Sequence, residues 1–254
     1  MDRSDEVARL VELWEAHRPV LVFTGAGMST ASGIPDFRGK QGLWKGMDPT
    51  KVVSIEVFEE NPREFYAFYR QRLAMIRSVQ PNEGHRIVAE LEEKGYVSAV
   101  ITQNIDDLHG RAGSRRVFEV HGSVRSATCR RCGRRITGDE LVEGIDSSPD
   151  GVPRCPCGGV FKVDVVLFGE PLPQDVWEGA LAEAERASMA VVLGSSLVVY
   201  PAAYIPRIVK NRGGKLAIVN ADPTPLDSMA DVTIRADLVE VLREVRKGLL
   251  GADG

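Results

Sequence analysis

A short apolar run followed by closely spaced glycines constrains the fold of this chain more than any other feature. Residues 19–23 read PVLVF and predict a buried strand. Gly25 and Gly27 follow at once. A strand, a tight glycine turn and a helix start form the geometry that presents backbone N–H groups to a phosphate. Glycines allow the close approach because they lack a Cβ. A third glycine of the dinucleotide fingerprint would fall at Thr30, so the motif alone also fits an ordinary turn of an α/β protein.

Short apolar segments alternate with amphipathic ones along most of the chain. Strands are expected at 97–102, 117–120, 165–168, 189–193, 215–219 and 231–234, and helices at 4–17, 61–77, 81–94, 173–187, 201–211 and 237–248. This alternation predicts a Rossmann-like, doubly wound parallel sheet covered by helices on both faces. Polar motifs end four of these strands: GAG at 25–27, QNID at 103–106, GSS at 194–196 and NAD at 220–222. Because the carboxyl ends of parallel strands share one edge, we expect one composite site.

Composition favours a cytoplasmic protein over a membrane protein or a dedicated nucleic-acid binder. The 254 residues include 43% hydrophobic and 27% charged side chains, which is typical of a soluble domain. No apolar run reaches about 18 residues, and the charged N-terminus has no signal-peptide core, so no membrane association is expected. A net charge of −4 argues against a dedicated nucleic-acid binder. We expect a monomer.

The four cysteines are confined to one segment. Cys129 and Cys132 form a CxxC pair, and Cys155 and Cys157 form a CxC pair after 22 intervening residues. Such clustering in a reduced compartment favours a metal over disulfides, and four thiolates suit a structural Zn²⁺. The segment around them is poor in core residues. Ligation by three cysteines and another group remains an alternative, because CxC changes the chelate geometry.

Residues 25–39, GAGMSTASGIPDFRG, closely resemble the signature of the sirtuins, the NAD-dependent protein deacylases. The motifs QNID, HG, the paired cysteines, FGE, GSS and IVN follow in the family order. The resemblance implies a discontinuous NAD-binding large domain at 1–33, 81–122 and 164–254. It further implies a cofactor loop and helical part at 34–80 and a zinc module, with a structural Zn²⁺, at 123–163.

The resemblance also implies the chemistry. An acyl-lysine amide oxygen attacks the NAD ribose, nicotinamide leaves, and His121 acts as general base toward a ribose hydroxyl. Asn104 would order ribose and water, while Asp36 could equally be a loop cap. Residues expected to contact NAD are Gly25, Ala26, Gly27, Thr30, Asp36, Phe37, Arg38, Gln103, Asn104, Ile105, Asp106, Gly194, Ser195, Ser196, Asn220, Ala221, Asp222, Asp237 and Leu238.

The second substrate would be an acylated lysine in a protein or peptide. The resemblance places the peptide between the domains, along Val166, Leu167, Phe168, Gly169 and Glu170. Tyr69 and Arg72 resemble the Tyr-x-x-Arg pair of sirtuins that remove succinyl and malonyl groups, since a phenol and a guanidinium suit a carboxylate. The same two residues could instead be a core tyrosine and a surface arginine, and Val53 could narrow the acyl tunnel.

Other functions remain open from the sequence. One is a mono-ADP-ribosyltransferase on the same fold, and another is a non-enzymatic zinc-ribbon binding protein that uses the arginines near the cysteines. A dehydrogenase is less favoured, because its acidic ribose ligand about 20 residues after the glycine turn would fall in a Pro/Gly-rich loop.

Overall fold

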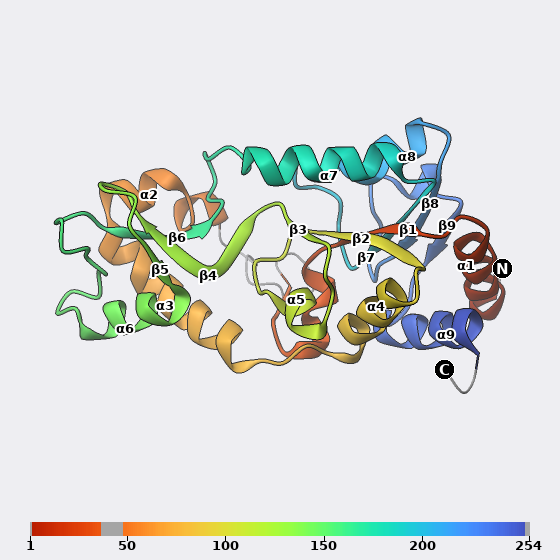
Figure 1. The fold of residues 1–254 in the computed structure, drawn as a ribbon, viewed down its shortest axis with the longest axis horizontal. Coiled ribbons are helices and arrows are strands. Elements are labelled where there is room, and N and C mark those ends of the chain that lie inside the picture. Colours follow the sequence, from red (N-terminus) through yellow and green to blue (C-terminus); the bar gives the residue numbers. More distant parts are fainter. Residues whose placement is uncertain (1, 37–47, 252–254) are drawn as a thin grey trace.

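Two sheets form the framework of the computed structural model, which describes residues 2–36 and 48–251 (Figure 1). The larger sheet is parallel throughout, in the order β3-β2-β1-β7-β8-β9. Its strands are β1 Val20–Thr24, β2 Val97–Thr102, β3 Val117–Glu119, β7 Met189–Leu193, β8 Lys215–Val219 and β9 Val232–Ile234. This is the doubly wound order, and the chain reverses direction across the sheet between β1 and β7. The predicted fold class is confirmed.

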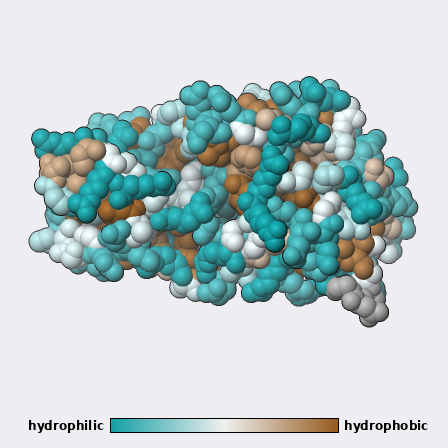
Figure 2. Space-filling view, viewed as in Figure 1, coloured by the Kyte–Doolittle hydropathy of each residue, from teal (hydrophilic) through white to brown (hydrophobic). Residues whose placement is uncertain are grey.

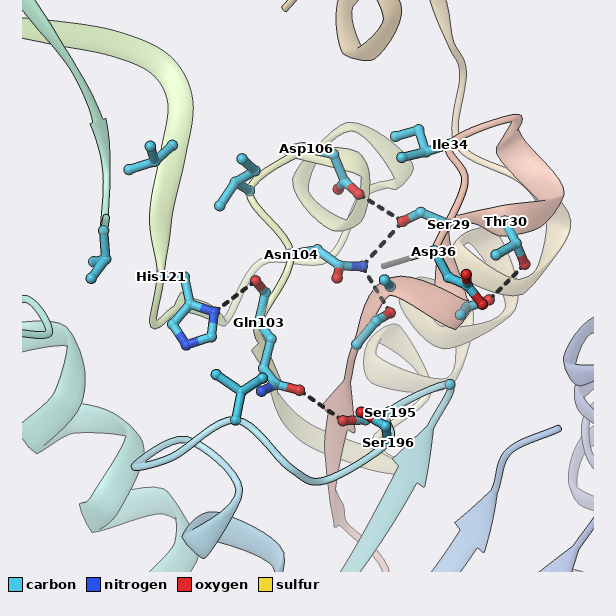
Figure 3. A pocket seen from close by; sticks show the side chains of 18 of the residues that line it. Ser29, Thr30, Ile34, Asp36, Gln103, Asn104, Asp106, His121, Ser195 and Ser196 are labelled. Atoms are coloured by element: carbon cyan, nitrogen blue, oxygen red, sulfur yellow. Dashed lines mark hydrogen bonds between the residues drawn. The ribbon is translucent and has the colours of Figure 1, made fainter. Parts of the chain in front are cut away.

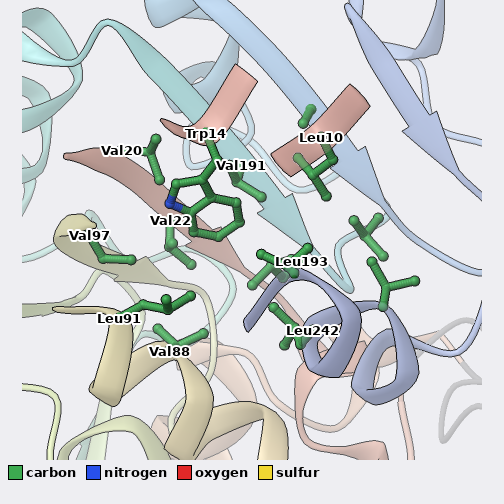
Figure 4. Close-up of a cluster of buried hydrophobic side chains, with 14 of the residues drawn as sticks. Leu10, Trp14, Val20, Val22, Val88, Leu91, Val97, Val191, Leu193 and Leu242 are labelled. Atoms are coloured by element: carbon green, nitrogen blue, oxygen red, sulfur yellow. The ribbon is translucent and has the colours of Figure 1, made fainter. Parts of the chain in front are cut away.

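One face of the large sheet is covered by three helices (Figure 1). They are α1 Arg3–Ala16, α4 Glu83–Glu93 and α9 Leu238–Leu250. Every second residue of β1 and β7 points into this layer, so Val20 and Val22 pack with Leu193 against Trp14 and Leu10 (Figure 4). Strands buried on both faces read as continuous apolar runs, which is why the period-two pattern was invisible in the sequence.

Two helices cover the opposite face. They are α7 Gln174–Arg186 and α8 Tyr204–Asn211. Small residues such as Ala180 and Ala184 let α7 approach the sheet, where the alternate residues Leu21 and Phe23 of β1 are fully buried. Burying both faces removes the sheet from water and stabilises it through the hydrophobic effect.

The smaller sheet is antiparallel and lies at the other end of the molecule (Figure 1). It consists of β4 Gly122–Cys129, β5 Arg135–Thr137 and β6 Phe161–Val165, with α2 Ile55–Glu60, α3 Pro62–Ser78 and α6 Gly138–Ser147 packed nearby. The expectation that the cysteine segment is poor in core residues was wrong. Leu141 and Val163 are fully buried against aromatic residues of α3, and the Tyr66 hydroxyl donates to the Phe161 carbonyl.

Several predicted element boundaries need correction. Pro81 does not open a helix; Asn82 is the N-cap, and its side chain accepts from the His85 N–H. The strand expected at 165–168 ends at Val165, since the chain then turns and Phe168 pairs only with Ser54. The remaining short elements are η1 Ala26–Met28, η2 Thr30–Ser32, η3 Pro49–Lys51, α5 Leu108–Ala112 and η4 Asp227–Met229. The expected short helix after the glycine turn is thus two 3₁₀ turns, and α8 begins three residues later than predicted.

The face drawn in Figure 2 is mainly hydrophilic, with hydrophobic residues in small separated patches. Within residues 2–36 and 48–251, no helix combines the length and apolar character needed to span a membrane.

The glycine turn after β1 packs directly on the end of β7. A Cβ on Gly27 would lie 2.8 Å from the Gly194 Cα, and one on Gly194 would lie 2.5 Å from the Met28 nitrogen. Gly194 also has a φ of +64°, which residues with a side chain rarely adopt. The Gly27 N–H donates to the Gly194 carbonyl at 2.9 Å, so the two strand ends are joined backbone to backbone.

Gly194→Ala tests this contact. We expect it to lower the free energy of unfolding by about 3 kcal/mol, because it adds a backbone clash to the cost of a positive φ. Gly213→Ala is the matched control. Gly213 has a φ of +90° but open space around it, so its substitution should cost only about 1 kcal/mol. Equal losses in urea denaturation would show that the close approach contributes nothing.

Candidate functional site

A cleft of about 1680 Å³ opens at the carboxyl ends of the parallel strands. Ordinary small-molecule sites hold about 300–1,000 Å³, so this cleft has room for two ligands. The candidate residues that line it are Gly25, Ala26, Gly27, Thr30, Asp36, Tyr69, Arg72, Gln103, Asn104, Ile105, Asp106, His121, Val166, Leu167, Phe168, Gly169, Glu170, Gly194, Ser195, Ser196, Asn220, Ala221, Asp222, Asp237 and Leu238. Phe37 and Arg38 lie outside the described residues.

Hydrogen bonds join the strand ends across the floor of the cleft. The Ser195 hydroxyl, after β7, donates to the Gln103 side-chain oxygen, after β2, at 2.7 Å (Figure 3). The two residues flank β1 from either side, so this bond crosses the point where the sheet reverses. It fixes the rotamers of two side chains that both face the cleft.

Asn104 and Asp106 meet at a buried hydroxyl that sequence analysis missed as a site residue. Asn104 Nδ2 donates to the Gly25 carbonyl at 3.0 Å and to Ser29 Oγ at 3.1 Å, and Ser29 donates to Asp106 Oδ2 at 2.6 Å (Figure 3). Burial raises the pKa of the Asp106 carboxyl, although the bonds from Ser29 and from the Leu108 N–H oppose this shift. The signal for Ser29 was its place in the glycine turn, one residue before Thr30.

His121 stands between the two sheets with one nitrogen bonded. Its Nδ1 lies 3.1 Å from the Gln103 carbonyl oxygen, which can only accept, so Nδ1 carries the proton (Figure 3). Nε2 therefore keeps a lone pair, and in Figure 3 it points away from Gln103. Burial lowers the pKa of the imidazole, and the bond to Gln103 partly offsets this. The ring is thus a neutral base at physiological pH.

The structure explains why a glycine follows His121. Gly122 has a φ of +74°, and a Cβ there would lie 2.2 Å from the Asp164 carbonyl oxygen. The chain therefore turns tightly against β6 as it leaves His121. The His121 carbonyl then accepts from the Val166 N–H at 2.8 Å, which ties His121 to the segment predicted to bind peptide.

Tyr69 and Arg72 lie on one face of α3 and line the cleft from the small-sheet side. Tyr69 stacks on Phe65 at a centroid distance of 4.6 Å, and burial raises the pKa of its phenol to about 12. Arg72 is only 9% exposed. Burial lowers its pKa, but a guanidinium still stays protonated, so a buried positive charge borders the cleft.

The opposite end of the cleft is formed by loops after β8 and β9. Asn220 Nδ2 donates to the Asp222 carbonyl at 2.7 Å, and Asp237 is the N-cap of α9, accepting from the Glu240 N–H at 3.0 Å. Asp237 thus has a structural partner and still lines the cleft. Trp177 and Tyr200 line the cleft as well. Sequence analysis missed them, because no pattern distinguishes them from aromatic residues of the core or the surface.

The four cysteine sulfurs gather in the small-sheet lobe, all within 4.8 Å of one another. Cys129 and Cys157 are 3.5 Å apart, and Cys132 and Cys155 are 3.7 Å apart. These distances far exceed a disulfide bond of about 2.05 Å. They approach the edge of about 3.8 Å expected for a tetrahedron of Zn–S bonds of about 2.3 Å. The donor set therefore fits one structural zinc ion, and the CxC pair reaches the cluster as well as CxxC does.

Comparisons with known proteins agree on one family. The model of the Sir2 family matches residues 25–201. An NAD-dependent protein deacetylase of Saccharolobus solfataricus is 47% identical over 91% of this chain and 93% of its own length. The NAD-dependent protein deacylase 2 of Archaeoglobus fulgidus is 47% identical over 95% of each chain. A solved complex of Sir2 with p53 peptide and NAD⁺ superposes with a TM-score of 0.86 at 43% identity, covering 94% of this chain and 96% of that one.

Replacement of one cysteine tests the metal centre. We expect about one zinc per purified chain, and we expect Cys157→Ser to lose most of it, because thiolates supply all four contacts. The variant should also lose several kcal/mol of unfolding free energy. Metal content is measured by elemental analysis, with Ser147→Ala in the same lobe as control. Full zinc content in Cys157→Ser would point to a three-cysteine site.

Proposed function

This chain belongs to the Sir2 family, and we propose that it removes acyl groups from lysine side chains of proteins while consuming NAD. One observation carries the proposal. A neutral histidine with a fixed tautomer faces a cleft that is bordered by a glycine turn on one side and by residues 166–170 on the other. The deacetylase and deacylase names of its relatives support the same activity.

The large-sheet half of the cleft fits NAD. Gly25 and Gly194 bring bare backbone to its floor at the point where the sheet reverses, which is where such sheets bind dinucleotides. Ser195 and Gln103 would hold ribose or phosphate, and Asn220 would hold the adenosine side. When bound, NAD supplies a ribose carbon that takes the acyl oxygen as nicotinamide leaves.

His121 acts as the general base. Its Nε2 lone pair accepts a proton from a ribose hydroxyl, while Nδ1–H stays bonded to the Gln103 carbonyl. The same carbonyl stabilises the imidazolium that forms, since it accepts a hydrogen bond from the charged ring. Asp106 is held by Ser29 at the buried end of the cleft, where it would accept from the nicotinamide amide.

Residues 166–170 would bind the peptide. Phe168 is fixed on one side, where its N–H donates to the Val53 carbonyl at 3.1 Å and its carbonyl accepts from Ile55 at 2.9 Å. Glu170 accepts from the Leu167 N–H and pairs with the buried Lys162 at 2.8 Å. The segment is therefore rigid before a peptide arrives, which reduces the entropy cost of binding an extended chain.

His121→Ala should lower kcat on an acetyl-lysine peptide by at least about 100-fold, because general-base catalysis contributes that much or more. In the native protein, kcat/KM should stay flat near neutral pH and fall only below the ordinary pKa of histidine, since burial lowers the His121 pKa. Nicotinamide release and peptide mass report both. His17→Ala, at the end of α1, is the control. An unchanged rate in His121→Ala would exclude it as the base.

We further propose that Tyr69 and Arg72 bind the carboxylate of succinyl or malonyl groups. Both line the inner part of the cleft, and a buried guanidinium beside a buried phenol offers charge-assisted bonds that an acetyl group cannot use. Val53 also lines the cleft.

The double variant Tyr69→Phe/Arg72→Met should lower kcat/KM for a succinyl-lysine peptide by about 100-fold, the effect of losing two bonds to a charged group. Activity on the matched acetyl peptide should fall less than about threefold. Arg70→Met is the control, because Arg70 lies on the same helix but pairs with Asp146 at the surface. Equal losses on both peptides would assign Tyr69 and Arg72 to the core instead.

A further inference from the structure

A chain of hydrogen bonds runs behind the cleft, through three residues to which the mechanism gives no role, and ends at Asn104. Thr24 and Thr102 end β1 and β2 in register, and their hydroxyl oxygens are 2.8 Å apart. His109 Nε2 lies 3.0 Å from Thr24 Oγ1 at one end. At the other end, the Asn104 N–H donates to Thr102 Oγ1 at 3.0 Å. All four residues are buried, with Asn104 the most exposed at 7%.

The bonds have a consistent direction. The Thr24 hydroxyl donates to Thr102, so its oxygen is free to accept, and the His109 nitrogen that faces it carries the proton. Thr102 then accepts twice, from Thr24 and from the backbone of Asn104. We name the three residues that lead to Asn104, which are His109, Thr24 and Thr102, the strand-end ladder.

The histidine at the base of the ladder is packed against a second one. The rings of His85 and His109 meet edge to face at 4.8 Å. Burial lowers the pKa of both rings. The positive charge of Arg86 lowers the pKa of His85 further, and the neighbouring His85 disfavours a charge on His109, so both rings are neutral. Within the described residues, neither ring nitrogen of His85 has a hydrogen-bond partner. Nδ1 of His109 has none there either. The bond to Thr24 therefore fixes how His109 is oriented.

The ladder holds Asn104 at two points. Its backbone N–H is bound through Thr102, and its side chain donates to the carbonyl of Gly25, the residue next to Thr24. A shift of Thr24 would therefore move both anchors together. We propose that His109, Thr24 and Thr102 are positioning residues that set the Asn104 side chain toward the ribose and water of the reaction. This inference rests on the proposed deacylase function.

The decisive pair of variants is Thr102→Val and Thr102→Ser. Valine keeps the shape but removes the acceptor of the Asn104 N–H, so kcat should fall about tenfold with the KM for NAD within about twofold. Serine keeps the hydroxyl and should restore most of kcat. Thr233→Val, at a half-buried position of the edge strand β9, is the control for exchanging a strand threonine for valine. Equal losses in the valine and serine variants would overturn the proposal, as would an unchanged kcat in Thr102→Val.

A second readout does not depend on turnover. Long-range ¹H–¹⁵N spectra of histidine-labelled protein should show His109 as a neutral Nε2–H tautomer, assigned with His109→Gln, and Thr24→Val should shift that signal. The Nδ1–H tautomer in the native protein would overturn the ladder. Absence of nicotinamide release by the native protein would refute the proposed function instead, and the spectra would then test the ladder separately.

Discussion

The site depends on one close contact between backbones, the packing of the glycine turn after β1 on Gly194 after β7. No side chain fits there, so the two strand ends meet with only peptide groups between them. The contact lies where the sheet reverses its winding direction, and it sets the positions of Ser195 and the QNID segment on either side. Geometry at the floor of the cleft is therefore determined by the main chain, which is the least variable part of a protein surface.

Much of this arrangement could be predicted from the sequence, because the polar motifs of the site directly follow the strands along the chain. GAG, QNID, GSS and NAD were expected at one edge of a parallel sheet, and the order of β2, β1, β7 and β8 places them side by side. Every residue expected to contact NAD or peptide that the structure describes lines the cleft. What each of them binds stays a prediction, as do the domain boundaries.

Other features could not be predicted, for physical reasons. The core of the small-sheet lobe is shared between α3 and strands about 50 to 100 residues later, so no local sequence pattern predicts it. The end of β6 at Val165 is decided by Gly122 and by the 53–55 segment, which lie far away in sequence. Ser29 was overlooked because its importance comes from two partners in the loop after β2, not from its neighbours in sequence.

The bond from His121 to the Gln103 carbonyl has one more consequence. It occupies Nδ1, so Nε2 is the ring nitrogen that can take up and release a proton. A proton taken up at Nε2 has to depart from Nε2 as well, into the same cleft from which it came. In the proposed mechanism, His121 is therefore regenerated as a base only when that cleft admits a proton acceptor, which is product, buffer or water. Release of the proton from His121 is therefore coupled to the exchange of ligands in the cleft.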